Sequence, residues 1–247
     1  MLKKSKSHFL FAAKQFLIAG GYTDGNYLAT EVIDVQSNSK VTSSFGDIPS
    51  ERGYAVGGLL GSTPILCGGR DNDDVRGYQD SCFTLKDSQW RQTHKMTTKR
   101  SGSASVQINA STLWILGGYN RVYDKLDSSE FVELDSTVGK PGPKLPYAVS
   151  SPCAVKYKDK VFMIGGKLYR SSYLNKVLIF NPMNDFTHIE GPPLITKRSG
   201  HACSLMSNGQ QSKIVVAGGY NGIWLSSVEI FDPTVNNWIP GKEIHFF

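Results

Sequence analysis

Short apolar runs that end in a pair of glycines recur along the chain. Each run has four residues, is rich in Ile, Val, Leu and Phe, and is followed by a polar loop. A run of this length that stops at glycine favours a buried β-strand over a helix. The five runs, with their glycine pairs, occupy residues 16–21, 64–69, 113–118, 161–166 and 214–219.

The spacing of the glycine pairs is nearly constant. Their first glycines stand at positions 20, 68, 117, 165 and 218, which gives steps of 48, 49, 48 and 53 residues. A polar insertion at residues 207–212 accounts for the longest step. A period of this size indicates an array of one repeated structural unit.

Each repeat carries three further short segments with the composition of strands. One segment of small and apolar residues precedes the glycine run, and a third run follows the polar loop. A short fourth segment carries Trp90, Phe186 or Trp238 in repeats two, four and five. The expected first strands lie in residues 8–13, 53–60, 101–108, 149–156 and 199–205, and the expected third strands in residues 31–35, 81–85, 130–134, 176–180 and 228–231.

Four short antiparallel strands in every repeat predict an all-β fold, a β-propeller of about five four-stranded blades. We expect one domain over residues 1–247, with the small residues of each first strand nearest the central axis. The expected blades cover residues 6–48, 49–96, 97–144, 145–193 and 194–241, followed by a tail at residues 242–247. We expect these blades to close a ring; the alternative is that they form part of a longer propeller.

The repeats resemble those of kelch proteins over essentially the whole chain. The motifs that carry the resemblance are Arg-Ser-Gly at 100–102 and 198–200, the glycine pairs, Tyr-Asn at 119–120 and 220–221, the stretch at 228–233 and Trp238. The match is weakest in repeat one, repeat two has Arg52 one position out of line, and repeat four has Pro146-Tyr147 in place of the arginine. The resemblance implies a propeller, in most members of six or seven blades, whose loop face docks a protein, often as the substrate-receiving part of a ubiquitin-ligase adaptor.

One face of the propeller is predicted to carry the binding residues. Because the first and second strands form a hairpin, the turn that opens each first strand lies beside the loop that follows each glycine pair. Arginine and tyrosine gather in these segments, and both residue types dominate protein interfaces. The expected partner is a protein or an acidic peptide, held by Arg52, Arg70, Arg100, Tyr119, Asn120, Tyr147, Tyr169, Arg198, Tyr220 and Asn221, with Tyr22 and Lys167 on the same face.

Each of these residues also has a structural interpretation, since an arginine or tyrosine at a strand end can cap the strand and fill the gap between blades. Two further sets are expected to serve the fold alone, as turn residues and as core. They are Gly20, Gly21, Gly68, Gly69, Gly117, Gly118, Gly165, Gly166, Gly218 and Gly219, together with Trp90 and Trp238.

Composition and charge narrow the choice of partner. A hydrophobic content of 40% and a charged content of 19% in 247 residues are those of an ordinary globular protein. The net charge is +6, but the basic residues are scattered, which predicts a solvated surface and no nucleic-acid partner. No apolar stretch is long enough to span a bilayer. We expect a cytoplasmic protein, with secretion as the alternative.

The four cysteines, Cys67, Cys82, Cys153 and Cys203, show no CxxC pair and no histidine at zinc-ligand spacing. We therefore expect no metal site and four reduced thiols packed as small apolar side chains. A disulfide between Cys67 and Cys82, which flank one predicted hairpin, is the alternative, and it would require an oxidising compartment.

No arrangement of residues predicts catalysis or a cofactor. The five histidines occupy different positions of the repeat, and His201 is interpreted as a strand histidine rather than a metal ligand. Asp71, Asp73 and Asp74 are interpreted as a solvated loop. The protein is thus predicted to be a non-catalytic interaction module. The alternatives are a glycan-binding propeller and a kelch-type enzyme, an oxidase or a sugar isomerase.

Overall fold

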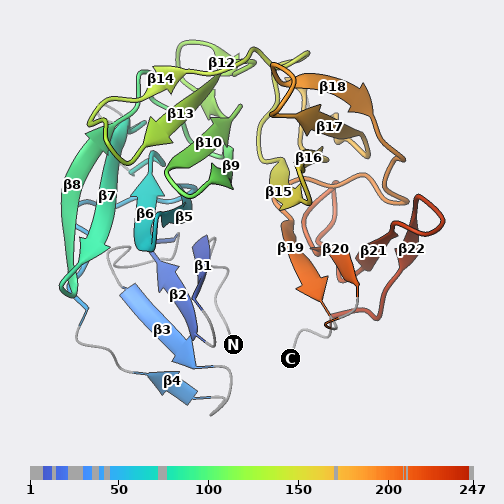
Figure 1. Ribbon diagram of the computed structural model, residues 1–247, viewed down its shortest axis with the longest axis horizontal. Helices are drawn as coiled ribbons and strands as arrows, with labels where there is room; N and C mark the ends of the chain where they lie inside the picture. The colour runs from blue at the N-terminus through green and yellow to red at the C-terminus, as the bar shows by residue number, and fades with distance from the viewer. Residues whose placement is uncertain are drawn as a thin grey trace.

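The structure, a computed structural model, describes residues 8–12, 15–21, 30–34, 39–41, 45–71, 77–169, 172–207, 209 and 211–244. These residues contain no α-helix and form five antiparallel four-stranded sheets, one after another along the chain. The sheets stand around a common centre (Figure 1). The predicted all-β propeller fold of four-stranded blades is confirmed, and we number its sheets blades 1 to 5.

The strands of each blade are consecutive in sequence, from the inside of the propeller outward. Blade 1 consists of β1 (His8–Ala12), β2 (Gln15–Ala19), β3 (Thr30–Asp34) and β4 (Ser39–Val41). Blade 2 consists of β5 (Val56–Leu60), β6 (Thr63–Cys67), β7 (Ser81–Lys86) and β8 (Gln89–Lys95). Blade 3 consists of β9 (Ala104–Asn109), β10 (Thr112–Leu116), β13 (Ser129–Glu133) and β14 (Lys140–Pro141).

The last two blades follow the same plan. Blade 4 consists of β15 (Cys153–Tyr157), β16 (Lys160–Ile164), β17 (Val177–Asn181) and β18 (Thr187–Glu190). Blade 5 consists of β19 (Ala202–Ser207), β20 (Ser212–Ala217), β21 (Val228–Asp232) and β22 (Asn237–Pro240). A separate two-stranded hairpin, β11 (Tyr119–Asn120) and β12 (Asp124–Lys125), lies in the loop between β10 and β13.

Strand boundaries differ from the sequence prediction in two ways. The inner strand begins three residues later than expected in blades 2, 3 and 5 and four residues later in blade 4, because the residues before it pair with the post-glycine loop instead. Ser101, for example, forms an isolated antiparallel bridge with Tyr119. Phe186 lies outside β18, in the turn before it, with a φ of 53°.

The glycine pairs end the second strands where other backbone approaches closely. At Gly117 the φ is 59°, and a Cβ atom would lie 2.5 Å from the carbonyl oxygen of Val149, at the start of the next blade. At Gly118 it would overlap Ser103 Oγ. A side chain at either position would therefore be strained; at Gly117 it would push against the start of blade 4, and at Gly118 against the turn that opens the inner strand of its own blade.

Apolar side chains from facing sheets form the core between successive blades. Trp114 and Leu116 of blade 3 are fully buried and belong to one cluster with Val161 and Met163 of blade 4. The inner strands β1, β5, β9, β15 and β19 contact one another in this order. The position of the first strands nearest the axis is as predicted.

This packing is interrupted between blade 5 and blade 1. Phe162, Ile164 and Val177 of blade 4 are 5%, 0% and 1% exposed, because blade 5 covers them. Val215 and Ala217, at the positions of Phe162 and Ile164 in the repeat, are only half-buried. β1 and β19 lie on either side of an opening (Figure 1). The described residues therefore form an open arc and not the closed ring that was expected.

The four cysteines form two disulfides, so the expectation of reduced thiols is wrong. Cys67 and Cys82 are direct partners on β6 and β7, with Cα atoms 4.1 Å apart, as the alternative had it. Cys153 and Cys203 join β15 to β19, with Cα atoms 6.0 Å apart. This second pair could not be read from spacing, because its members meet only when two blades pack together.

Candidate functional site

In blades 2 to 5 the loop after each glycine pair folds back as a small hairpin. The residue after the second glycine forms an antiparallel β-bridge with the turn that opens the inner strand. It forms a second antiparallel pair with a residue later in its own loop, which closes the hairpin. The four closing pairs are Arg70 with Tyr78, Tyr119 with Lys125, Lys167 with Tyr173, and Tyr220 with Trp224. Every pair thus contributes an aromatic ring together with a cation or a second ring.

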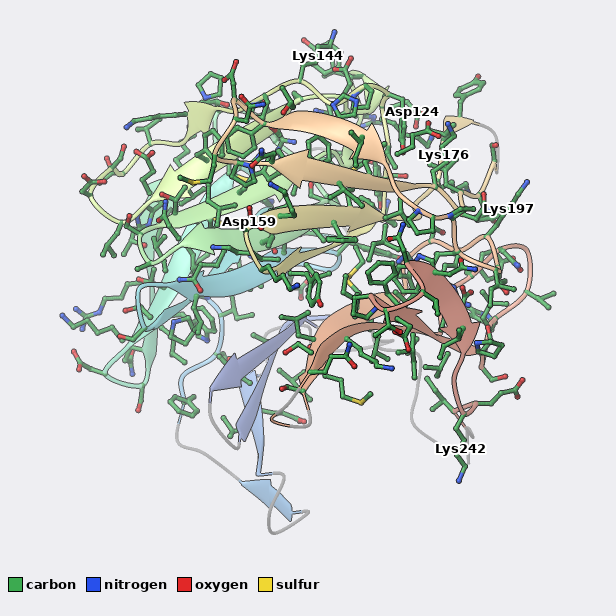
Figure 2. All side chains as sticks on the ribbon, turned by 45° about the vertical axis from the view of Figure 1, so that its right-hand side comes forward. Asp124, Lys144, Asp159, Lys176, Lys197 and Lys242 are labelled. Carbon is green, nitrogen blue, oxygen red and sulfur yellow. A yellow bond between two sulfur atoms is a disulfide. The ribbon has the colours of Figure 1, made fainter. Side chains whose placement is uncertain are left out.

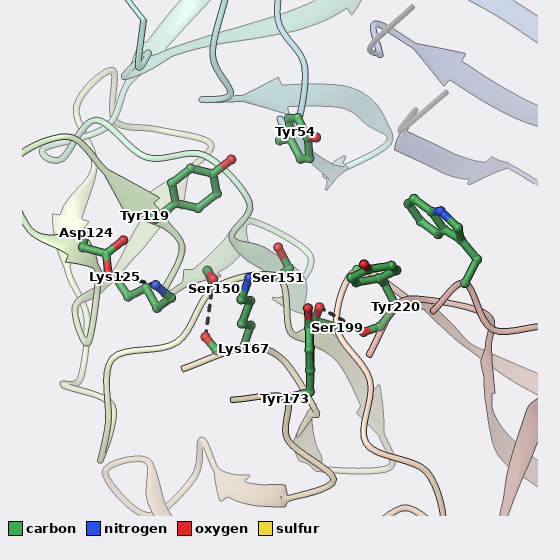
Figure 3. Close-up of a pocket in the computed structure, with 12 residues that line it drawn as sticks. Tyr54, Tyr119, Asp124, Lys125, Ser150, Ser151, Lys167, Tyr173, Ser199 and Tyr220 are labelled. Atoms are coloured by element: carbon green, nitrogen blue, oxygen red, sulfur yellow. Dashed lines mark hydrogen bonds and ion pairs between the residues drawn. The ribbon is translucent and has the colours of Figure 1, made fainter. Parts of the chain in front are cut away.

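The hairpins of blades 3 to 5 line a cavity of about 510 Å³ on the face where the inner strands begin. The turns that open the strands complete its wall. Its lining residues are Tyr54, Tyr119, Asp124, Lys125, Ser150, Ser151, Lys167, Tyr173, Ser199, Gly200, Tyr220 and Trp224. Figure 3 shows Lys167 reaching into the space between Tyr119 and Tyr220, with Lys125 beside Asp124 next to Tyr119.

The aromatic rings around the cavity hold one another in place. Tyr220 packs on Trp224 with ring centroids 5.0 Å apart and meets Tyr173 edge-on at 5.8 Å. Tyr119 meets Tyr78 edge-on at 5.7 Å. Contacts of this geometry fix ring orientation at low entropic cost to a later binding event.

The charges at the cavity are mainly positive. Lys125 forms an ion pair with Asp124 at 2.9 Å, whereas Lys167 has no carboxylate within ion-pair distance among the described residues. The Lys167 ammonium lies 5.4 Å from the centre of the Tyr173 ring. Burial raises the pKa of the Tyr119 hydroxyl, and a hydrogen bond with Ser101 and the nearby Arg70 only partly oppose this. Tyr119 is thus a neutral hydroxyl beside cations.

The largest correction to the predicted site concerns three arginines. Arg52, Arg100 and Arg198 are 1%, 1% and 0% exposed. Each guanidinium donates hydrogen bonds to the carbonyl at the end of its second strand and to a serine at the start of its third. For Arg100 these acceptors are Gly117 and Ser128. These side chains clamp three strands of their own blade, so a partner at the surface does not reach them.

Two arginines also hold a buried carboxylate. Arg100 contacts Glu130 Oε1 at 2.7 Å, and Glu130 Oε2 accepts hydrogen bonds from the backbone and hydroxyl of Thr97. Arg198 contacts Glu229 in the same way, at 2.7 Å. Among the residues that the structure describes, Arg52 has no carboxylate within ion-pair distance; its guanidinium lies 4.4 Å from the centre of the Phe83 ring.

The structure also aligns the repeats that looked irregular. β9 contains one extra residue in its pairing with β10, next to Thr112 and Leu113, which explains why Arg52 seems one position out of line with Arg100. In blade 4 the arginine position belongs to Val149, whose carbonyl accepts a hydrogen bond from Gly118 as that of Arg100 does from Gly69. The expectation that Pro146-Tyr147 replaces the arginine is therefore corrected.

The other predicted binding residues divide between the cavity and the framework. Tyr119 and Tyr220 line the cavity, and exposed Tyr169 lies 5.8 Å from Lys125. Arg70 lies beside the cavity wall, 5.5 Å from the Tyr54 ring.

Three further predicted residues shape the protein itself or lie away from the cavity wall. Asn120 is buried and accepts hydrogen bonds from the backbone of Val122 and Tyr123. Tyr147 packs on the core between blades 3 and 4, where burial raises its pKa to about 12. Asn221 is partly exposed and does not line the cavity. Tyr22 lies outside the described residues.

Sequence reasoning missed Tyr54, Lys125, Tyr173 and Trp224, all of which line the cavity. The last three close the loop hairpins. They stand four or six residues after the residue that follows the second glycine, because the loops differ in length. A search for a second aromatic or cationic residue within each post-glycine loop would have found them. Finding Tyr54 would have required the correct alignment of repeat two with the other repeats.

The residues expected to serve the fold lie within the blades. The ten glycines of the pairs all have positive φ. Trp90 is buried and donates a hydrogen bond to Thr30 of blade 1 at 2.8 Å. Trp238 is buried and donates to the carbonyl of Pro192 at 2.9 Å.

Charged and metal-ligating groups elsewhere do not converge. In the described part of the chain no three His, Cys, Asp or Glu side chains are placed to hold a metal ion. Figure 2 shows Lys144 at the top, Lys176 and Lys197 at the right and Lys242 at the bottom of the molecule, all on its outside. No helix long and apolar enough to cross a membrane occurs in the described residues.

Comparison with known proteins matches the repeat pattern. A profile of the Kelch motif matches residues 209–243. Human Kelch-like protein 23 is 25% identical over 234 residues, which cover 90% of this chain and 38% of the relative. Human Kelch-like protein 15 is 23% identical over 241 residues, 87% of this chain and 38% of the relative. Mouse Kelch-like protein 40 is 30% identical over 177 residues, 68% of this chain and 27% of the relative. The chain thus spans about two fifths or less of these curated relatives.

Proposed function

The chain is a kelch-repeat protein, and we propose that it is a non-catalytic interaction module that binds a protein segment in the cavity among its loop hairpins. The observation that carries the proposal is the repeated closing pair. The closing pairs of three successive blades, blades 3 to 5, each place an aromatic ring, with a cation or a second ring, in the wall of one cavity, and Tyr54 of blade 2 completes that wall.

The chemistry of the cavity favours a segment with an acidic side chain next to an apolar one. Lys167 and Lys125 offer positive charge, and Tyr220 with Trp224 offers a rigid aromatic surface. Tyr123, Tyr169 and Ile223, on the surrounding loops, are exposed and can extend an apolar contact. Aromatic anchors beside cations are typical of the residues that dominate binding energy.

The finer proposal is that the bound segment belongs to a protein destined for ubiquitination. It rests on the family resemblance alone, because the cavity itself carries no information about the fate of its ligand. If it is right, a ubiquitin-ligase subunit is recovered together with the captured partner from cells that express the protein.

The experiment that tests the main proposal is site-specific photo-crosslinking in cells. A photoreactive phenylalanine at position 220 should yield a crosslinked protein, which is then purified and titrated against the wild-type chain. Tyr119→Ala with Tyr220→Ala, and separately Lys167→Glu, should each weaken binding at least about tenfold. Asp159→Ala, in the exposed turn between β15 and β16 at the opposite ends of the strands, is the matched control and should bind normally.

Two outcomes contradict the proposal. One is a crosslinked partner whose affinity is unchanged by the cavity variants. The other is saturable binding on a glycan array that is lost in Tyr119→Ala and Tyr220→Ala, which would establish the glycan-binding alternative instead.

A further inference from the structure

The contact between blades 4 and 5 is closed by a covalent bond. Cys153 is the register partner of Ile164 on the face of blade 4 that blade 5 covers, and Cys203 is the partner of Val216 on the facing side of blade 5. The bond therefore crosses from sheet to sheet at the inner strands. Both cysteines are partly exposed, whereas Cys67 and Cys82 are 0% exposed.

The other contacts between described blades have no covalent bond at these positions. Val56 faces Ser105 between blades 2 and 3, and the Ser105 hydroxyl donates to the carbonyl of Gly57 at 2.7 Å. Between blades 3 and 4, Ala104 stands at the position of Cys153 in the repeat and Ala154 at the position of Cys203. Blades thus pack stably without a disulfide, and the contact between blades 4 and 5 can exist in a bonded and an unbonded form.

The candidate binding cavity lies across this same contact. Ser151 and Lys167 of blade 4 line it together with Gly200 and Tyr220 of blade 5. Directly beside the cysteines, the amide of Gly200 donates to the carbonyl of Ser151 at 2.8 Å. The separation of the two blades therefore sets the distance between the two halves of the cavity wall.

We propose that the Cys153–Cys203 bond is a thiol-exchange site that regulates the cavity, and that small thiols such as glutathione open it. A glutathione thiolate attacks one sulfur, forms a mixed disulfide and releases the other cysteine as a thiolate, which takes up a proton. A second glutathione then releases the first cysteine, so that two cysteine thiols and one oxidised glutathione result. The proposal rests on the function proposed above only in its consequence for binding.

The first test follows the order of reduction in the native protein. The unreduced full-length chain is incubated with reduced glutathione, free thiols are trapped with iodoacetamide, and peptides are quantified by mass spectrometry. Cys153 and Cys203 should be labelled at least about tenfold faster than Cys67 and Cys82, which solvent does not reach. Equal rates, the reverse order, or four free thiols before any reductant is added would overturn the proposal.

The second test measures whether reduction loosens this contact alone. Hydrogen exchange at the Gly200 amide should accelerate at least about tenfold on reduction. The Gly102 amide, which donates to Tyr54 between blades 2 and 3, and the Ser151 amide, which donates to Gly102 between blades 3 and 4, are matched controls and should not change. Unchanged exchange at Gly200 would contradict the regulatory role even if the bond is reducible.

A double variant, Cys153→Ala with Cys203→Ala, reproduces the alanine pair found between blades 3 and 4. It should show fast exchange at Gly200 with and without glutathione. Neither labelling nor exchange needs a ligand, so failure of the partner experiment leaves these results intact. If a crosslinked partner is found, its affinity should differ at least about threefold between the oxidised and the reduced chain. Its affinity for the double variant should not change with glutathione. Equal affinities for the oxidised and the reduced chain would overturn the proposed effect on the cavity.

Discussion

Blades 3 and 2 place the same arginine at the same point of the repeat but balance its charge differently. In blade 3 the guanidinium of Arg100 meets Glu130, and both side chains are 1% exposed or less. In blade 2 the residue at the position of Glu130 is Phe83, and Arg52 lies over its ring. Burial lowers the pKa of Arg52 to about 10, with only distant help from Asp71 and Asp80. The clamp on the backbone carbonyls is therefore the common element, and the carboxylate is an addition.

Blade 4 supports this interpretation, because it has neither charge. Val149 stands at the arginine position, Leu178 stands at the position of Glu130, and both are buried in one apolar cluster. The two positions thus hold an ion pair, a cation over a ring, or two apolar side chains. Where the arginine is absent, the carboxylate is absent as well. This is expected, because a buried charge is costly unless it is paired.

The largest effect is expected from breaking the ion pair of blade 3. Glu130→Ala leaves the Arg100 guanidinium buried without its carboxylate and removes two hydrogen bonds to Thr97. We expect a loss of about 3–5 kcal/mol in the free energy of unfolding, measured by chemical denaturation. The double change Arg100→Val with Glu130→Leu copies blade 4 and should cost less than Glu130→Ala alone. A larger cost for the double change would show that the two blades are not equivalent.

A smaller effect is expected at Arg52, where no carboxylate is orphaned. Arg52→Leu removes the hydrogen bonds to Gly68 and Ser81 and leaves their carbonyls without these donors. We expect a loss of about 1–3 kcal/mol in the same denaturation experiment. A loss as large as that of Glu130→Ala would mean that the backbone clamp, and not the ion pair, dominates in both blades.

A comparison of blades 3 and 5 gives a prediction for pH. Ser103 of blade 3 donates to the carbonyl of Gly117, and His201 takes its position in blade 5. Burial, and then the charge of Arg198, lower the pKa of His201 to about 3. Below pH 6.5 the His201 imidazole binds a proton in the unfolded chain but stays neutral in the folded chain. The free energy of unfolding therefore falls by about 1.4 kcal/mol per pH unit as the pH drops toward 3. At pH 5 this amounts to about 2 kcal/mol.

The control for this prediction is His201→Ser, which copies blade 3. Denaturation curves of both proteins between pH 7 and pH 4 separate the histidine from the surface carboxylates, which titrate in both. Parallel pH profiles for the two proteins would show that His201 is not buried in its neutral form.

The smallest effect is expected on the open side of blade 5. Val215 is half-buried, whereas Ile65, at the same position of blade 2, is 0% exposed. Val215→Ala should cost about 1 kcal/mol or less, and Ile65→Ala about 2–5 kcal/mol, because only the second change leaves a cavity. Equal costs would indicate that another sheet covers blade 5 in solution.

Much of the fold was predictable because it depends on local signals. The glycine pairs, the apolar runs and the period determine where strands end and which strand follows which, and the hairpin between the first two strands brings turns and loops to one face. Tyr119 and Tyr220 could be placed near the cavity for this reason. Lys125 and Trp224 could not, because loops of unequal length hide which residue closes each hairpin.

The sequence by itself determined the repeating blade and the face on which its loops gather, since both follow from the alternation of strands and turns over short distances. Only the tertiary structure decided that Arg52, Arg100 and Arg198 are buried clamps, that Cys153 meets Cys203, and that blade 5 remains uncovered. Each of these depends on which surfaces of a blade another segment covers. The sequence shows an arginine in the same way whether its guanidinium binds a partner protein or a carbonyl of its own blade. Only the burial of the side chain distinguishes a binding arginine from a structural one.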